Sequence, residues 1–194
     1  MCGICGVLAT VGRGTQRSQR DLATAMAATL RHRGPDASGV WVDPSGRTAL
    51  GHTRLAIVDL SDAGTQPMTS ANGRWTITYN GEVYNTDDLR RSLDSVGWRG
   101  HSDTEVLVEH IARHGVEATL KAIRGMFAFG CWDAHESELW LARDRFGEKP
   151  LYYGFHQGAL LFASELKALR TVPGFGSDID RQALAEYFRW TNVP

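Results

Sequence analysis

The second residue of the chain is a cysteine that could act as a nucleophile. The chain opens Met1-Cys2-Gly3-Ile4-Cys5. If Met1 is removed, Cys2 becomes the N-terminus and carries both a thiol and a free α-amine. A thiol reacts as the thiolate, and an α-amine, with an ordinary pKa of ~7.7–8.0, could take the thiol proton near neutral pH. One residue would then supply both nucleophile and base.

The spacing Cys2-x-x-Cys5 also resembles half of a zinc site or a redox pair. Zinc usually takes four ligands, often from two such pairs, but the only other thiol is Cys131. The run Gly3–Leu8 is short and apolar, which predicts a buried strand with Cys5 as a small core residue. We therefore predict no metal site.

The segment Tyr79-Asn80-Gly81-Glu82 allows two interpretations. Asn-Gly after an alternating strand is a strong hairpin signal, so a structural turn is the simpler one. In the other, the Asn80 side-chain amide and the Gly81 N–H hold the oxyanion that forms when a thiolate attacks an amide. The absence of a Cβ at Gly81 would let a ligand approach the backbone closely.

Two charged side chains could recognise an amino acid. Arg54 stands at a predicted strand end, where arginine is usually solvated or ion-paired; if buried, its planar guanidinium suits a carboxylate. Asp103 in a first helical turn is explained by the helix dipole, but it could also receive an ammonium group. His52 is better explained as a packed histidine. The charged loop Arg143–Pro150 fits a contact for another domain better than an active site.

The composition indicates an ordinary globular domain. The 194 residues suit one domain, with 42% hydrophobic and 22% charged residues. The net charge of −1 favours neither nucleic acid nor an anionic membrane, and no apolar run approaches the ~18 residues that would span a bilayer. Three cysteines and no secretory signal predict a cytoplasmic location.

The elements that must position these residues alternate between short strands and helices. A helix is predicted over Ser18–Arg33, with Ser18 as its cap, after a surface loop at Gly12–Gln16. Strands are predicted at Ser38–Val42, Ala49–Arg54, Ala56–Asp59, Trp75–Tyr79, Met126–Trp132, Leu139–Arg143, Leu151–Phe155 and Ala159–Phe162. Further helices are predicted at Thr86–Asp94, Asp103–His114, Ser164–Arg170 and Asp180–Trp190. This α+β order fits a four-layer helix–sheet–sheet–helix sandwich, among other arrangements.

Ordered motifs along the whole chain add up to a family resemblance. They are Met1-Cys2-Gly3-Ile4-Cys5-Gly6, His32-Arg33-Gly34-Pro35-Asp36, the run from His52 to Asp59, the run from Tyr79 to Asn85, Ser102-Asp103-Thr104-Glu105, the run from Arg124 to Phe129, Arg143–Tyr152 and the run from Phe162 to Lys167. The chain resembles the glutaminase domain of class II glutamine amidotransferases, in the glutamine-hydrolysing asparagine synthetase branch. This implies the N-terminal nucleophile hydrolase fold, an αββα sandwich of two antiparallel sheets.

The resemblance also implies roles for single residues. Cys2 is then the nucleophile after methionine removal, and its α-amine is the base. Asn80 and Gly81 match the oxyanion hole, Arg54 the position that binds the glutamine α-carboxylate, and Asp103 the position that binds its α-ammonium. The other positions implied to line the pocket are Ile57, Val58 and Glu82. Arg33 is implied to be supporting rather than catalytic.

The resemblance implies a glutaminase domain over residues 1–180 and a linker or contact segment over 181–194. Family members continue into a synthetase domain that uses ATP and magnesium, and here we find no Gly-rich phosphate loop. We therefore predict no cofactor for this chain. The implied partners are L-glutamine and a synthetase domain in cis or in trans, and a homodimer is compatible with this. Alternatively, the domain is a weakly active or non-hydrolysing scaffold that docks a synthetase partner.

Overall fold

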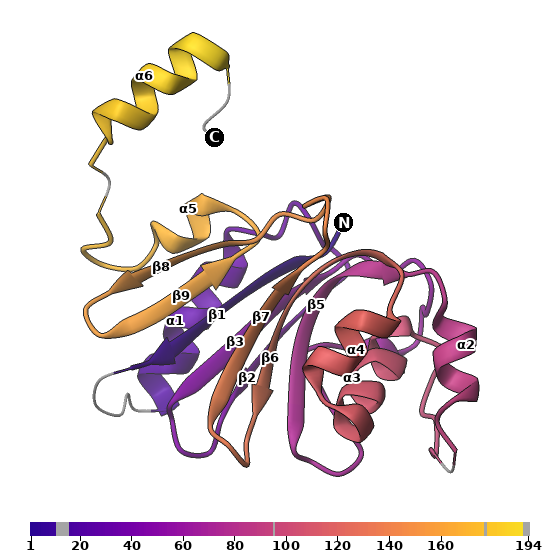
Figure 1. Cartoon of the computed structure of the whole chain (residues 1–194). Helices are drawn as coiled ribbons and strands as arrows, with labels where there is room; N and C mark the ends of the chain where they lie inside the picture. The colour runs from indigo at the N-terminus through magenta and orange to yellow at the C-terminus, as the bar shows by residue number, and fades with distance from the viewer. Residues whose placement is uncertain (11–15, 95, 177, 192–194) are drawn as a thin grey trace.

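Two antiparallel sheets lie face to face between two layers of helices (Figure 1). The computed structural model describes residues 1–10, 16–94, 96–176 and 178–191. The predicted α+β sandwich with four αββα layers is confirmed. The predicted loop at Gly12–Gln16 falls outside the described residues, apart from Gln16.

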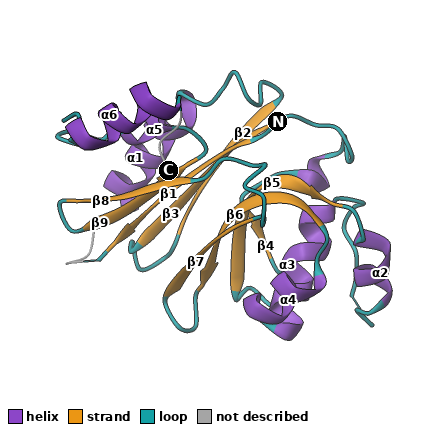
Figure 2. Cartoon of the chain, turned by 45° about the horizontal axis from the view of Figure 1, so that its top comes forward, coloured by secondary structure: helices purple, strands orange, loops and turns teal. Residues whose placement is uncertain are grey.

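The first sheet has the strand order β2-β3-β1-β9-β8. Its strands are β1 (Gly3–Ala9), β2 (Ala37–Val42), β3 (Thr48–Arg54), β8 (Tyr152–His156) and β9 (Ala159–Ala163). β1 lies in the middle, antiparallel to β3 and β9. Helices α1 (Gln16–Ala28) and α5 (Leu166–Leu169) cover its outer face (Figure 2). β1 starts at Gly3, so Met1 and Cys2 lie at the end of this sheet.

The second sheet has the order β4-β5-β6-β7. Its strands are β4 (Met68–Thr69), β5 (Trp75–Val83), β6 (Gly125–Asp133) and β7 (Glu138–Arg143). Helix α3 (Asp103–His114) packs on β4 and β5, with α2 (Thr86–Arg91) and α4 (Val116–Ala122) beside it. β4 is so short that most of β5 is unpaired along that edge. The candidate site lies along this edge.

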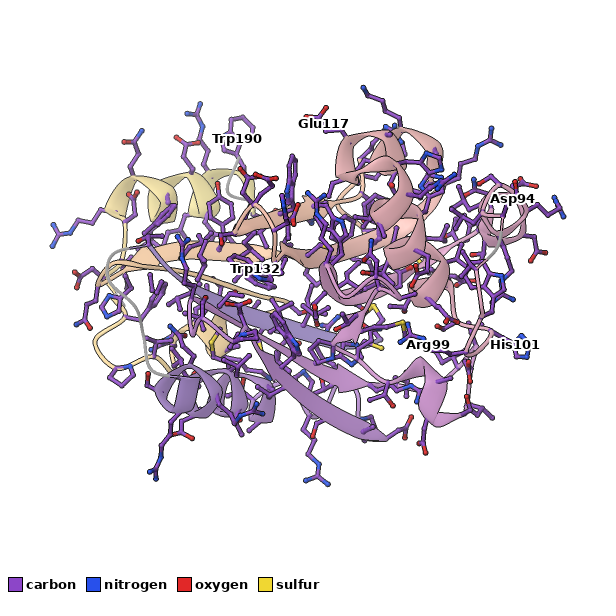
Figure 3. The ribbon with its side chains drawn as sticks, turned by 90° about the horizontal axis from the view of Figure 1, so that it is seen from below. Asp94, Arg99, His101, Glu117, Trp132 and Trp190 are labelled. Carbon is purple, nitrogen blue, oxygen red and sulfur yellow. The ribbon has the colours of Figure 1, made fainter. Side chains whose placement is uncertain are left out.

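The core between the sheets is built from side chains that both sheets contribute. Ile4, Leu50 and Phe162 come from the first sheet, and Ala128 and Trp132 from the second. Trp132 is 1% exposed and lies in the middle of the molecule (Figure 3). Its Nε1 donates to Asp43 Oδ1 at 3.0 Å, so its one polar group is satisfied. The two sheets are therefore held in a fixed relation.

Helix α6 (Arg181–Trp190) extends away from the sandwich (Figure 1). None of its residues is buried. It coincides with the segment 181–194 that was expected to link or contact a further domain, of which 192–194 fall outside the described residues. That role stays a prediction. None of the described helices is long and apolar enough to cross a membrane.

Several predicted elements differ from the structure in extent or type. Helix α1 runs over Gln16–Ala28 and is followed by turns, so the predicted end at Arg33 and the predicted cap at Ser18, which lies in the first turn, are both wrong. The strand predicted at Ala56–Asp59 is a loop. Its polar groups bond to side chains instead of to a neighbouring strand, as in the 2.8 Å bond from Ala56 N–H to Asp36 Oδ2. The short elements β4 and α4 were not predicted.

Candidate active site

One pocket brings together the residues that the sequence analysis assigned to catalysis and substrate binding. It has a volume of about 160 Å³ and lies where the start of β1, the end of β3, the edge of β5 and the first turn of α3 meet. The predicted site residues that line it are Cys2, Arg54, Ile57, Val58, Asn80, Gly81, Glu82 and Asp103. These come from segments far apart in the chain, so the fold assembles the site.

Cys2 lies just beyond the paired part of β1. The ladder with β3 begins at the pair of Gly3 and Thr53. The half-buried Cys2 thiol contacts the main chain of Leu55, at 3.4 Å from its N and 3.7 Å from its O. The Cys2 carbonyl accepts a 3.0 Å hydrogen bond from Arg33 Nε. The Cys2 thiol therefore lies at the pocket wall, held by the Leu55 main chain, on a residue outside the strand pairing.

Cys5 has a different environment. It is fully buried under α1, where its thiol donates to Ala23 O at 3.7 Å, as predicted for a core residue. Burial raises the pKa of this thiol to about 12, more than the Gly51 main chain lowers it. Among the described residues, no group of three or more His, Cys, Asp or Glu side chains could hold a metal ion.

Asn80 and Gly81 lie inside β5, so the hairpin interpretation is wrong. The strand continues to Val83, because β6 pairs with it over its full length. Asn80 is 2% exposed, and its Nδ2 is buried without a hydrogen-bond partner among the described residues. An unpaired buried donor costs about 1–3 kcal/mol. Such a donor in a pocket wall is well placed to receive a ligand oxygen.

The Gly81 N–H points toward the same pocket. On either side of it, Tyr79 N–H donates to Gln66 Oε1 at 2.7 Å and Val83 N–H to Asp103 Oδ2 at 3.1 Å. N–H groups alternate between the two edges of a strand, so the Gly81 N–H lies between these two on the edge away from β6. Glycine is required there, because a Cβ would lie 2.3 Å from the Met126 carbonyl oxygen of β6.

Arg54 is buried at the end of β3 and holds one pocket wall. Its Nη1 donates to Ser61 O at 2.8 Å, and its Nη2 donates to Asp59 O. These bonds fold the following loop over the guanidinium. Ile57 and Val58 lie on that loop, 72% and 61% exposed, at the rim of the pocket. Arg54 thus shapes the pocket and also lines it.

Asp103 is the first residue of α3, where Ser102 caps the helix by accepting from Glu105 N–H at 3.2 Å. The Asp103 carboxylate also accepts a 2.8 Å hydrogen bond from Tyr79 Oη. Burial raises the pKa of Asp103, more than its hydrogen bonds lower it, and the nearby carboxylate of Glu82 raises it further. A bound ammonium group would compensate this partly buried charge.

His52 is a packed histidine, as predicted. It is 1% exposed, and its Nε2 lies 3.2 Å from Tyr79 O. Burial is the main cause that lowers its pKa to about 4; the bond to Tyr79 opposes the shift, and the charge of Arg54 adds to it. Next to it, Thr78 Oγ1 donates to Gly51 O at 3.0 Å. These bonds fix β5 against β3 beside Asn80.

Several residues that line the pocket were not assigned to the site from the sequence, and Lys149 is the charged one that comes from a distant loop. Lys149 is 7% exposed, and its Nζ lies 3.5 Å from Met1 Sδ. The loop that carries it was expected to contact another domain. However, it folds around Asp144, which accepts the N–H groups of Glu148 and Lys149 at 2.9 and 3.0 Å and so turns Lys149 inward. An aspartate just before a Gly-containing charged stretch was the available signal for such a turn.

Comparison with known proteins places the whole chain in one group. A family model described as "Glutamine amidotransferase domain" matches residues 1–194. "Asparagine synthetase [glutamine-hydrolyzing] 3" of Bacillus subtilis is 41% identical over 195 residues, which cover 97% of this chain and 30% of that protein. A protein with the same name from Arabidopsis thaliana is 40% identical over 170 residues, 87% of this chain and 28% of the plant protein.

Solved structures agree on the fold. The "structure of the allosteric regulatory enzyme of purine biosynthesis" matches with a TM-score of 0.73 and 25% identity, over 88% of this chain and 43% of that one. Glutamine phosphoribosylpyrophosphate amidotransferase from B. subtilis matches with a TM-score of 0.71 and 23% identity, over 87% of this chain and 43% of that one.

This chain spans about 30% of the length of the two curated relatives named above.

Proposed function

Because this chain belongs to the class II glutamine amidotransferase domain family, with relatives of the asparagine synthetase type, we propose that it hydrolyses L-glutamine to L-glutamate and ammonia through Cys2. One observation supports this most directly. The buried Asn80 Nδ2 lacks a partner among the described residues and lines the same pocket as the Cys2 thiol. An amide carbonyl between them would meet a nucleophile and an oxyanion donor together.

In the proposed reaction, the α-amine of mature Cys2 takes the thiol proton and the thiolate attacks the glutamine carboxamide carbon. Asn80 Nδ2 and the Gly81 N–H donate to the oxyanion of the tetrahedral intermediate. The C–N bond then breaks, and the α-amine returns the proton to the leaving nitrogen, which departs as ammonia. Water attacks the resulting γ-glutamyl thioester, passes a proton through the α-amine to the thiol, and releases glutamate.

The two charged residues of the pocket would recognise the other end of glutamine. We assign the α-carboxylate to Arg54 and the α-ammonium to Asp103, with Glu82 at the rim beside it. Ile57 and Val58 would close one side through the loop that Arg54 holds. With the α-carboxylate and the α-ammonium bound in this way, the side-chain carboxamide of glutamine would extend to Cys2.

The ammonia would serve amide synthesis by an ATP-dependent synthetase domain, in cis or in trans. Relatives with names of glutamine-hydrolysing asparagine synthetases are longer than this chain, which supports asparagine or a related amide as the product. In this proposal ATP and magnesium belong to the synthetase domain. A domain that only docks a synthetase, with weak or no hydrolysis, is the alternative.

The test is ammonia release from glutamine by the chain with Met1 removed, verified by mass. We expect hydrolysis by the parent and by Cys131→Ala, which removes a fully buried thiol from the second sheet, and none by Cys2→Ala. Parent-like ammonia release by Cys2→Ala would refute the mechanism. A parent rate that is near zero alone and also near zero with an added synthetase domain would favour the docking alternative.

A further inference from the structure

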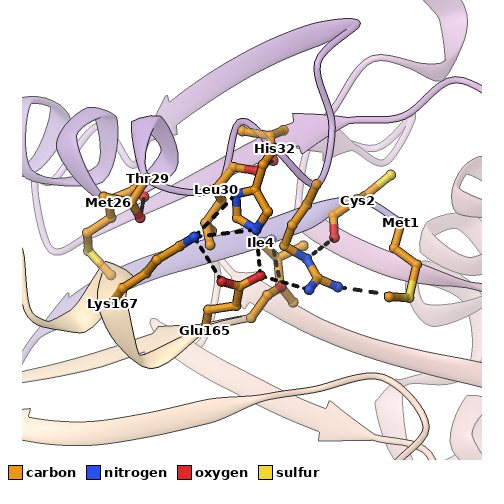
Figure 4. Close-up of polar contacts among 12 residues, drawn as sticks. Met1, Cys2, Ile4, Met26, Thr29, Leu30, His32, Glu165 and Lys167 are labelled. Atoms are coloured by element: carbon orange, nitrogen blue, oxygen red, sulfur yellow. Dashed lines mark hydrogen bonds and ion pairs between the residues drawn. The ribbon is translucent and has the colours of Figure 1, made fainter.

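A cluster of charged side chains lies next to Cys2 but outside the pocket (Figure 4). Glu165, just before α5, is at its centre. Its Oε1 accepts from Arg33 Nη1 at 3.0 Å and lies 2.9 Å from His32 Nε2, while its Oε2 lies 3.1 Å from Lys167 Nζ. The side chain of Arg33 is 10% exposed and that of Glu165 27%. The Arg33–Glu165 pair is therefore the sheltered part of the cluster.

Arg33 connects this cluster to the nucleophile. The same guanidinium that bonds Glu165 donates from Nε to Cys2 O at 3.0 Å (Figure 4). The main chain around Arg33 is fixed, because its N–H donates to Leu30 O at 2.8 Å and a Cβ at Gly34 would lie 2.3 Å from Thr53 O. The Arg33 side chain can still change the direction of its guanidinium plane. Glu165 sets that direction by bonding to Nη1, while Nε bonds to Cys2.

Glu165 is itself tied to the first strand. The neighbouring Ser164 accepts from Ile4 N–H through its Oγ at 3.0 Å and donates its own N–H to Ile4 O at 2.9 Å. The Ser164–Ile4 bonds thus fix the segment that carries Glu165 against the segment that carries Cys2, and both residues contact Arg33. The carboxylate is 132 residues from Arg33 in the chain, so only the fold brings them together.

Cys2 needs such an anchor. It lies beyond the last pair of β1 with β3, at Gly3, and beyond the last pair with β9, at Cys5. In the proposed mature form, which begins at Cys2, this residue has a chain neighbour on one side only. Its carbonyl bond to Arg33 then acts together with the Leu55 contacts of its thiol to fix where the thiol and the α-amine point.

We propose that Glu165 is a positioning residue for the nucleophile: it orients Arg33, which holds the Cys2 carbonyl and so directs the thiol and α-amine into the pocket. The inference rests on the proposed glutamine hydrolysis for its kinetic consequence. Glu165 does not line the pocket, so its loss should lower kcat and leave KM for glutamine nearly unchanged. A misplacement of about 1 Å in reacting groups can cost ~10²-fold in rate.

The test compares mature Glu165→Ala and Glu165→Gln with Lys167→Met as a matched control. Lys167→Met removes a charge from the same carboxylate but leaves the Arg33 bond. We expect kcat to fall ~10- to 100-fold in Glu165→Ala and less in Glu165→Gln, which keeps an acceptor, and to stay within about twofold in Lys167→Met. A kcat for Glu165→Ala that matches the parent, or an equal loss in Lys167→Met, would overturn the proposal.

A double-variant comparison separates positioning from general stabilisation. If Glu165 acts through Arg33, the double variant with Arg33→Ala and Glu165→Ala should be no slower than Arg33→Ala alone. Additive losses in kcat, measured well below the unfolding temperature of each variant, would contradict this.

A structural measurement does not depend on turnover. In crystals of the mature chain, we expect the bond from Arg33 Nε to Cys2 O in the parent and its loss in Glu165→Ala. If the parent hydrolyses no glutamine, the proposed function fails while this comparison still decides the positioning role. An intact bond in Glu165→Ala refutes the positioning role alone.

Discussion

Replacing Asn80 with alanine should slow glutamine hydrolysis strongly without loss of folding stability. Removing one oxyanion donor typically costs ~10²–10³ in kcat, or about 2.7–4 kcal/mol in transition-state stabilisation. Asn80 Nδ2 has no partner among the described residues, so the ground state loses no hydrogen bond from it. Glutamine binding, which we assign to Arg54 and Asp103, should change little.

The stability of this variant follows from the same unpaired amide. Leaving a buried donor unsatisfied costs about 1–3 kcal/mol, and Asn80→Ala removes that penalty while it loses part of the packing of a 2% exposed side chain. The two effects oppose one another. We expect the free energy of unfolding to stay within about 1 kcal/mol of the parent value.

Thr78→Val is the matched control, because Thr78 lies two residues earlier on the same face of β5. Its hydroxyl donates to Gly51 O at 3.0 Å, so the substitution removes one hydrogen bond between the two sheets. Its free energy of unfolding should fall by ~0.5–1.5 kcal/mol, while kcat stays near the parent value. Steady-state ammonia release and urea unfolding measure both quantities. A fall in stability with unchanged kcat in Asn80→Ala would refute the assignment of Asn80 as an oxyanion donor.

Three further predictions concern charge and the N-terminus. Asp103→Asn should raise KM for glutamine, and a lower KM would contradict the ammonium assignment. Burial raises the Asp103 pKa, so ionisation of this carboxyl opposes folding at neutral pH. The same substitution should therefore also raise the free energy of unfolding at pH 7. Burial raises the pKa of Glu165 less than its bonds to Arg33, His32 and Lys167 lower it, to about 2. Its stabilisation should thus be present above pH ~4.5 and lost as the pH falls toward 2, and urea unfolding of Glu165→Gln across that range should show a shallower decline. Protein that retains Met1 should be inactive, since Met1 blocks the amine and fills part of the pocket wall, and treatment with a methionine aminopeptidase should restore activity in step with the mass loss.

Local sequence patterns predicted most of the elements but failed where distant strands decide the outcome. Asn80-Gly81 has the composition of a hairpin turn, which reflects only the backbone freedom of two residues. Their pairing partners on β6 are Ala128 and Phe127, which lie 48 and 46 residues later in the chain. The long-range pairing overrides the local preference. The Gly81 N–H then points away from β6, and the Asn80 side-chain amide stays without a hydrogen-bond partner among the described residues.

The site shows the same limit in a sharper form. Residue types at Cys2, Arg54 and Asp103 suggest a nucleophile and two charge partners, and the order of motifs suggests the family; neither says which other groups hold these residues. Lys149 turns inward only because Asp144 gathers the N–H groups of its loop. The Glu165 carboxylate bonds to Arg33, which lies between α1 and β2 and in turn donates to the Cys2 carbonyl. In the mature form that we propose, Cys2 has a chain neighbour on one side only and therefore depends most on such distant contacts.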